Sequence, residues 1–152
     1  MSDNKILITD LEHNINKQLQ LWTADVQYGV CALVDEKADK LKNLIQENAP
    51  ARYKKKIKKR RKGKYKRSWK IKVITDNFSR YEKVVYASGD EYRLTHLLEK
   101  GHAKKGGGRV APRVHIAPNR DQIEKEYVSG IESLIKSSQR GGGGYRRSTY
   151  KK

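Results

Sequence analysis

The sequence predicts an α+β fold: a long N-terminal helix, then a small antiparallel or mixed sheet with helices on one face, together with basic loops and a disordered C-terminal tail. Three observations predict it. Apolar residues recur at helical spacing over the first 48 residues, two segments between 68 and 87 have strand-like composition, and a second helical stripe runs from 118 to about 138. We expect residues 1–139 to form one domain and residues 140–152 to form a separate tail.

The first helix begins at a capping box, in which Thr9 is the expected N-cap and Glu12 reaches back to it. Apolar side chains then recur in steps of three and four: Leu11, Ile15, Leu19, Trp22 and Val26. The pattern continues to about Asn48, where Ala49-Pro50 ends it. A straight helix of this length would measure roughly 57 Å, whereas a compact domain of this size has a diameter of roughly 38 Å. Either the helix breaks, with Gly29 as the natural place, or its overhang packs on another subunit.

A strongly basic segment follows the first helix. Residues 51–67, ARYKKKIKKRRKGKYKR, hold 12 basic residues and three large apolar ones, Tyr53, Ile57 and Tyr65. Like charges four residues apart disfavour a helix, and there is too little apolar surface to bury. We expect a mobile basic loop that orders only against an anion.

The next two segments predict a β-hairpin. Residues 68–75, SWKIKVIT, alternate in the manner of a half-buried strand. Asp76-Asn77 is a turn signal. Residues 78–87, FSRYEKVVYA, are rich in aromatic and β-branched side chains and predict the second strand.

The remainder of the chain predicts two helices and two loose segments. Residues 91–100 form a short helix that a glycine ends, and residues 101–112 form a flexible basic loop. Residues 113–117 could be a short strand. The last helix starts at Pro118, and its Gly-rich basic continuation, RGGGGYRRSTYKK over 140–152, is expected to be disordered.

The positive charge is concentrated in connections and ends. The chain carries 35 Lys and Arg against 17 Asp and Glu, a net charge of +18. Residues 51–72 contribute +14, residues 100–120 contribute +6 and residues 140–152 contribute +5, whereas the other segments are mildly acidic. A fold does not need such an imbalance, because self-repulsion destabilises the compact state. The pattern indicates a polyanionic partner, with nucleic acid as the expected one.

The candidate nucleic-acid-binding residues are the cations of the two predicted basic loops. They are Arg52, Lys54, Lys55, Lys56, Lys58, Lys59, Arg60, Arg61, Lys62, Lys64, Lys66, Arg67, Lys104, Lys105 and Arg109. Such side chains contact phosphates and carry no sequence information, and Tyr53 and Tyr65 are available to stack or pack. A solvated surface and a nuclear signal are the alternatives. However, 12 cations within 16 residues exceed what solubility needs, and the nuclear pattern is weakly specific.

No pattern indicates catalysis, a cofactor or a metal. The four histidines and Cys31 match no zinc spacing, and Gly106–Gly108 lack the context of a nucleotide loop. No Ser–His–Asp or Cys–His grouping is evident. The single cysteine excludes an internal disulfide, and no stretch has the apolar length of a signal peptide or a membrane span. We therefore expect a soluble, non-enzymatic protein, made and kept inside a cell, that needs no cofactor.

Five short motifs resemble, in their order and spacing, those of a known family over residues 49 to about 138. They are Ala49-Pro50, Gly63-Lys64-Tyr65-Lys66-Arg67-Ser68, Tyr86-Ala87, Leu97-Leu98-Glu99-Lys100-Gly101, and the stretch from Pro112 to Pro118. The family is that of the tail-completion, or head–tail joining, proteins in the neck of long-tailed bacteriophages, typified by the tenth gene product of a lambdoid coliphage. The chain departs from it in the long basic insertion before Gly63 and in Val114-His115-Ile116, where the family has an aromatic residue.

The resemblance implies an α+β structural protein without catalysis. It implies a ring, expected to be hexameric, at the head–tail junction of the virion, assembled in the host cytoplasm. Its partners would be further copies of the chain, neighbouring neck and tail-tube proteins, and viral DNA. In such a ring the basic loops would hold DNA by its backbone, and the overhang of the first helix would serve subunit packing.

Two other functions are consistent with the charge. A stand-alone nucleic-acid-binding protein, such as a ribosome-associated or nucleoid protein, would be a monomer or dimer with salt-dependent affinity. It explains less well the acidic first helix and the Leu-Leu-Glu-x-Gly motif. A toxin-like ribonuclease would need a catalytic set near the basic loop, and no histidine falls within residues 52–67.

Overall fold

The computed structural model describes residues 8–50, 63–77 and 80–139. Within them it confirms the α+β class, with two small antiparallel sheets and several helices. The elements are α1 (Ile8–Asn48), α2 (Lys64–Arg67), β1 (Trp69–Asn77), β2 (Arg80–Ala87), the 3-10 turn η2 (Gly89–Glu91), α3 (Tyr92–Lys100), β3 (His102–Ala103), β4 (Arg109–Val110) and α4 (Ala117–Gln139). The predictions for 51–62 and for the tail 140–152 lie outside the described residues.

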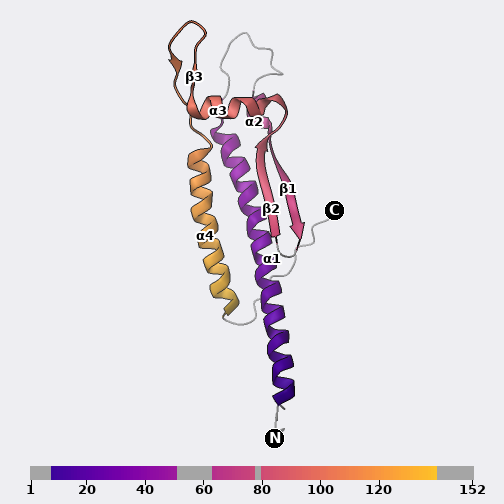
Figure 1. Ribbon diagram of the computed structural model, residues 1–152. Coiled ribbons are helices and arrows are strands. Elements are labelled where there is room, and N and C mark those ends of the chain that lie inside the picture. Colours follow the sequence, from indigo (N-terminus) through magenta and orange to yellow (C-terminus); the bar gives the residue numbers. More distant parts are fainter. Residues whose placement is uncertain (1–7, 51–62, 78–79, 140–152) are drawn as a thin grey trace.

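Helix α1 is unbroken over 41 residues, so the first of the two alternatives, a break at Gly29, is wrong. At ~1.5 Å per residue it is about 60 Å long. Figure 1 shows its N-terminal part extending well past the ends of α4 and of the β1–β2 hairpin. The helix already includes Ile8, which places Thr9 inside the helix and not at the predicted N-cap.

Helices α1 and α4 lie side by side (Figure 1) and approach closely at two glycines. A Cβ added to Gly29 would collide with the side chain of Leu134, and a Cβ added to Gly130 would collide with that of Leu33. Each leucine therefore fills the space that the opposite glycine leaves. Gly29 interrupts the apolar pattern of the sequence because it receives a side chain from α4.

A polar contact joins the same two helices on their surface. The Glu126 carboxylate accepts hydrogen bonds from Lys40 at 2.6 Å and from Lys37 at 3.5 Å. The hydrogen bond from Lys40, followed by one from Gln122, lowers the pKa of Glu126 to about 2. The ionised carboxylate is thus the form that the folded state favours.

Strands β1 and β2 form an antiparallel hairpin with one face on α1. Trp69 pairs with Ala87 and Ile71 with Val85 on the inner face, and the register shifts between Val73 and Thr75. This shift is a bulge at Ile74. The strand continues through Asp76 and Asn77, so the turn predicted there is wrong.

A second polar contact fixes the hairpin to α1. Tyr81 donates to Asp35 at 2.7 Å, and Lys83 forms an ion pair with the same carboxylate. Burial alone would lower the pKa of Lys83, but its hydrogen bonds with Asp35 and Tyr81 outweigh burial and raise it. Burial and the hydrogen bond to Asp35 likewise raise the pKa of Tyr81. Lys83 and Tyr81 therefore keep their protons, as the contact requires.

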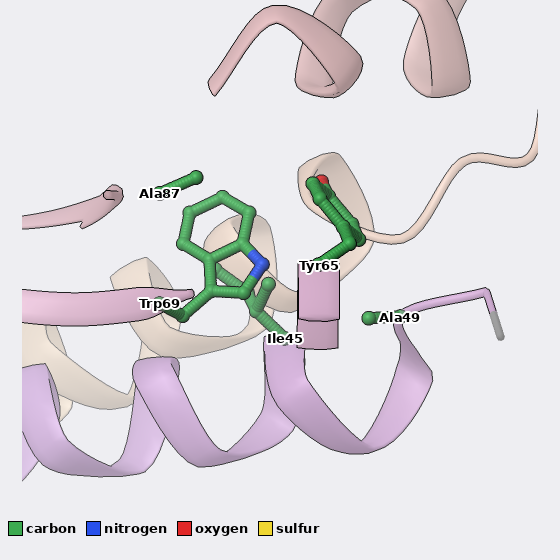
Figure 2. Close-up of a cluster of buried hydrophobic side chains, with 5 residues drawn as sticks. All are labelled: Ile45, Ala49, Tyr65, Trp69 and Ala87. Carbon is green, nitrogen blue, oxygen red and sulfur yellow. The ribbon is translucent and has the colours of Figure 1, made fainter. Parts of the chain in front are cut away.

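The main core lies at the C-terminal end of α1. Figure 2 shows Trp69 and Tyr65 edge to face above Ile45, with Ala49 and Ala87 on either side. The ring centroids of Tyr65 and Trp69 are 5.9 Å apart with an interplanar angle of 77°. Residues of α1, α2, β1 and β2 thus meet in one cluster, and Leu41, Val85, Leu94, Leu98 and Ile116 pack around it.

Two loops predicted from the sequence contain regular structure. The end of the predicted loop 51–67 is the short helix α2, and the predicted loop 101–112 is the hairpin β3–β4. The possible strand over 113–117 is wrong, because those residues have no strand pairing and Ala117 already begins α4. The short helix expected at 91–100 and the last helix are confirmed.

Replacing Gly101 by alanine should destabilise the fold strongly. Gly101 has φ 70° and ψ 172°, a backbone conformation that costs other residues roughly 1–3 kcal/mol, and an added Cβ would also collide with the Val110 carbonyl oxygen. Urea unfolding should show a loss of at least this size. Gly89→Ala is the control, because Gly89 has φ +65 and nothing within 4 Å of an added Cβ. Equal losses in the two variants would contradict the close contact at Gly101.

The Glu126 contact predicts a pH-dependent contribution to stability. A folded-state pKa of about 2, below the usual 4.5, means that the contribution is fully present above the usual value and is lost as pH falls toward the lowered one. The difference in unfolding free energy between the wild type and Glu126→Gln should therefore shrink between about pH 6 and about pH 3. Glu132→Gln removes a carboxylate from the exposed part of α4 and serves as the control. A constant difference for Glu126→Gln would contradict the ion pair.

Candidate nucleic-acid interface

The described cations of the predicted site lie at one end of the molecule. Helix α2, helix α3 and the β3–β4 hairpin meet above the C-terminal end of α1 (Figure 1). The α2 group comprises Lys64, Lys66 and Arg67, and the hairpin group comprises Lys104, Lys105 and Arg109. Helix α3, which is nine residues and roughly 13 Å long at ~1.5 Å per residue, runs between the two groups.

The α2 group is held by one buried residue. Gly63 takes a left-handed conformation with φ 68° before the helix, and Tyr65 is buried in the core. The helix therefore presents its basic residues outward on either side of Tyr65. Lys64 forms an ion pair with Glu91 at 2.9 Å, and Lys66 donates to the Glu47 carbonyl oxygen at 3.4 Å. Arg67 is exposed to solvent.

The hairpin group projects from the far end of α3. The Lys104 N–H donates to the Gly108 carbonyl at 3.0 Å, and the Gly107 N–H donates to the Lys104 carbonyl at 3.2 Å. Gly107 and Gly108 have φ of 89° and 79°, a region that glycine enters at little cost. The glycines thus close a turn, and Lys104, Lys105 and Arg109 are all exposed around it.

A buried polar cluster beneath the basic surface joins α2, α3 and the start of α4. One oxygen of Glu99 accepts hydrogen bonds from the backbone N–H groups of His115 and Ile116, at 2.8 Å each. The first N–H groups of a helix have no partner within the helix. The other oxygen of Glu99 accepts from the first of these, the Ala117 N–H, at 3.5 Å. Glu99 thus places negative charge at the positive end of α4.

The His115 ring lies between Glu99 and Tyr65. Burial, with a smaller effect of the Glu99 charge, raises the pKa of Tyr65 far above its usual value, so the phenol keeps its proton. The Tyr65 hydroxyl forms a hydrogen bond of 2.9 Å with His115 Nε2. Nδ1 lies 2.9 Å from the Arg113 carbonyl oxygen and 3.0 Å from a Glu99 carboxylate oxygen. Because both of these oxygens are acceptors, Nδ1 is the nitrogen that donates. Every polar atom of the ring has a partner, so the cluster is structural.

The structure describes six of the predicted site residues and brings them to one end in two groups. The other nine, from Arg52 to Lys62, lie outside the described residues. Three exposed cations beside the groups were missed by the sequence prediction: Arg93, Lys100 and Arg113. Lys100 and Arg113 belong to the segment 100–120, whose excess of positive charge is evident in the sequence. Arg93 lies outside the basic segments, and only its position on α3 shows that it is near the two groups.

The described residues offer no other chemistry at this end. Within 8–50, 63–77 and 80–139, no group of His, Cys, Asp and Glu side chains could hold a metal ion. In the same residues no helix has the length and apolar character to cross a membrane. What the surface can do is bind anions by charge and by hydrogen bonds from lysine and arginine.

The fold and the basic end define a small α+β protein built around one long helix. A family model described as "Bacteriophage HK97-gp10, putative tail-component" matches residues 14–101. The chain belongs to this family, and it is therefore a structural component of a phage tail. The match covers α1 from residue 14 onward, the β1–β2 hairpin and α3, and it includes the Leu-Leu-Glu-x-Gly motif. No curated protein and no solved structure matches the chain.

Removing the Glu99 carboxylate should destabilise the basic end. Glu99→Ala leaves the His115 and Ile116 N–H groups without their acceptor, and a buried unsatisfied group costs roughly 1–3 kcal/mol. Urea unfolding should show a loss within or above this range. Glu132→Ala, on the exposed part of α4, should change stability by no more than about 0.5 kcal/mol. A loss for Glu99→Ala as small as that of the control would contradict the role assigned to the carboxylate.

Proposed function

We propose that this tail component forms a ring at the head–tail junction of a phage and completes the tail. The ring is expected to be hexameric, with the basic end of each subunit directed toward DNA or toward acidic neighbours. The observation that carries this proposal is the polarity of the subunit. The basic groups lie at one end of a rod-like molecule, and the bare part of α1 lies at the other (Figure 1).

The charge supports a polyanion as the partner of the basic end. The run 52–67 holds 12 cations, so six copies would bring about 72 positive charges around one opening. That count includes the α2 group, and the three cations of the β3–β4 hairpin would add to it. Lysine and arginine at exposed positions bind phosphates without reading bases, which suits DNA that passes through a neck.

The remaining expectations follow from a neck position. The partners would be further copies of the chain and the neighbouring neck and tail-tube proteins, besides viral DNA. The protein would be part of the virion and would assemble in the host cytoplasm. The role is mechanical and electrostatic, and it involves no reaction.

The mass of the purified protein in solution tests the ring. Light scattering at low and high salt should show a hexamer or another closed oligomer, or a monomer that forms rings on isolated tails. A monomer or dimer that binds free duplex DNA tightly and does not assemble on tails would contradict the proposal and favour a stand-alone nucleic-acid-binding protein.

The salt dependence of DNA binding tests the basic end. Replacing Lys104, Lys105 and Arg109 with serine removes three exposed cations. Each lost phosphate contact should flatten the slope of log Kobs against log salt by ~0.9 on duplex DNA, so the triple variant should lose up to about 2.7. Replacing Lys54, Lys55, Lys56, Lys58 and Lys59 with serine should flatten the slope further.

The matched control removes three exposed lysines from the helices, in Lys17→Ser, Lys125→Ser and Lys136→Ser. It has the same net charge as the hairpin variant, so it separates local contact from total charge. An equal change in slope for the hairpin variant and the control would mean that the basic end is not the binding surface.

A further inference from the structure

Helix α1 carries an apolar stripe, and the described part of its own chain leaves the N-terminal half of this stripe uncovered. The stripe comprises Ile15, Leu19, Trp22, Val26, Gly29 and Leu33, which follow one another in steps of four and three. This is the spacing of a coiled-coil seam. Leu33 and Gly29 are the residues that meet α4, so Ile15 and Leu19 lie on the same side of the helix as an established interface.

Helix α4 ends before the stripe does. Trp22 donates to Ser138 at 3.1 Å, one residue before the end of α4, and Figure 1 shows α1 continuing alone from there. Ile15, Leu19 and Trp22 are 51%, 55% and 41% exposed. The β1–β2 hairpin cannot cover them, because Asp35, which contacts it, lies about 160° around α1 from Leu33 at ~100° per residue.

The outer face of the β1–β2 hairpin is a second surface that residues 8–50, 63–77 and 80–139 leave uncovered, and it is both apolar and basic. Lys70 pairs with Tyr86 and Lys72 with Val84 on this face. Tyr86 and Val84 are 37% and 36% exposed, and Ile74 at the bulge is 55% exposed. Apolar side chains gathered on a strand face that no helix covers are typical of an interaction surface.

We propose that the stripe of α1 docks on the outer face of the β1–β2 hairpin of a second copy of this chain. This inference rests on the proposed ring and names the contact that would build it. The charges are complementary: residues 8–28 hold three acidic residues, Asp10, Glu12 and Asp25, against one lysine. The hairpin face presents Lys70 and Lys72. Opposite potentials across an interface fix its register and reject wrong pairings.

The contact is head to tail, because the two surfaces differ and lie at different places on one subunit. A heterologous contact repeats from copy to copy and closes a ring when its rotation allows. A contact between two α1 stripes would be self-complementary and would end at a dimer. It would also bring two acidic segments together. The charges and the ring therefore both favour the hairpin face as the receiving surface.

Two single variants should each abolish assembly, and their mixture should restore one contact. Leu19→Glu removes the donating surface, and Tyr86→Glu removes the receiving one. Each should sediment as a monomer. Mixed in equal amounts, they should form a heterodimer of twice the 17.5 kDa of one chain, because one stripe and one hairpin face remain intact. The dimer cannot grow, since its two free surfaces are both blocked.

Val128→Glu is the matched control, because Val128 is 52% exposed on α4 and belongs to neither surface. It should assemble as the wild type does, and circular dichroism should show that all three variants are folded. Assembly of Leu19→Glu or Tyr86→Glu at wild-type size would overturn the docking contact while leaving the ring in place. Variants that stay monomeric when mixed would also overturn it. Wild-type protein that never assembles, alone or on tails, would contradict the proposed ring itself.

Discussion

The contact between the Glu99 carboxylate and the backbone just before α4 determines how the rest of the molecule is arranged. It fixes the C-terminal end of α3 to the N-terminal end of α4, with hydrogen bonds of 2.8 Å to two successive N–H groups. Because Asn48 of α1 also bonds Asn119 of α4 at 3.0 Å, both helices are anchored at this end. Because α4 starts at this fixed point, its length determines how much of α1 it packs against. The basic end of the molecule and the bare part of α1 are thus two consequences of one anchor.

The contact at this end does not by itself hold α1 and α4 together along their length. A second contact must keep the two helices in register over the rest of α4. Leu134 against Gly29 and Leu33 against Gly130 provide it, because a leucine can enter the opposite helix only where a glycine stands. Sliding one helix past the other by a turn would bring leucines against side chains. The pairing of α1 and α4 is therefore specified by shape, and the ion pairs of Glu126 add to it on the surface.

The sequence predicted the elements whose signal is local and repeated. The helical period of α1, the composition of the hairpin strands and the apolar stripe of α4 each extend over many residues. A single residue that departs from such a pattern therefore does not mask it. The sequence left a break at Gly29 open as one of two alternatives, because the side chain that explains this glycine, Leu134, lies 105 residues further along the chain. The β3–β4 hairpin escaped prediction because strands of two residues have no period, and α2 because its basic residues outweigh one buried tyrosine, Tyr65.

The candidate site was predictable in composition and not in geometry. Charge counts placed Lys104 and Lys64 in basic segments, but only the fold sets both at the ends of α3.

The structure adds a constraint on the proposed ring that charge alone does not give. The bare stripe of α1 and the outer hairpin face lie at different heights along α1 (Figure 1). If α1 were parallel to the ring axis, each copy joined through these surfaces would be shifted along that axis relative to the one before, and the assembly would be a helical filament. A flat ring therefore needs α1 to be inclined to the ring axis. Such an inclination would turn the end that carries α2 and the β3–β4 hairpin toward one rim of the ring. The repulsion among the basic ends would then be concentrated at that rim, where a polyanion could neutralise it.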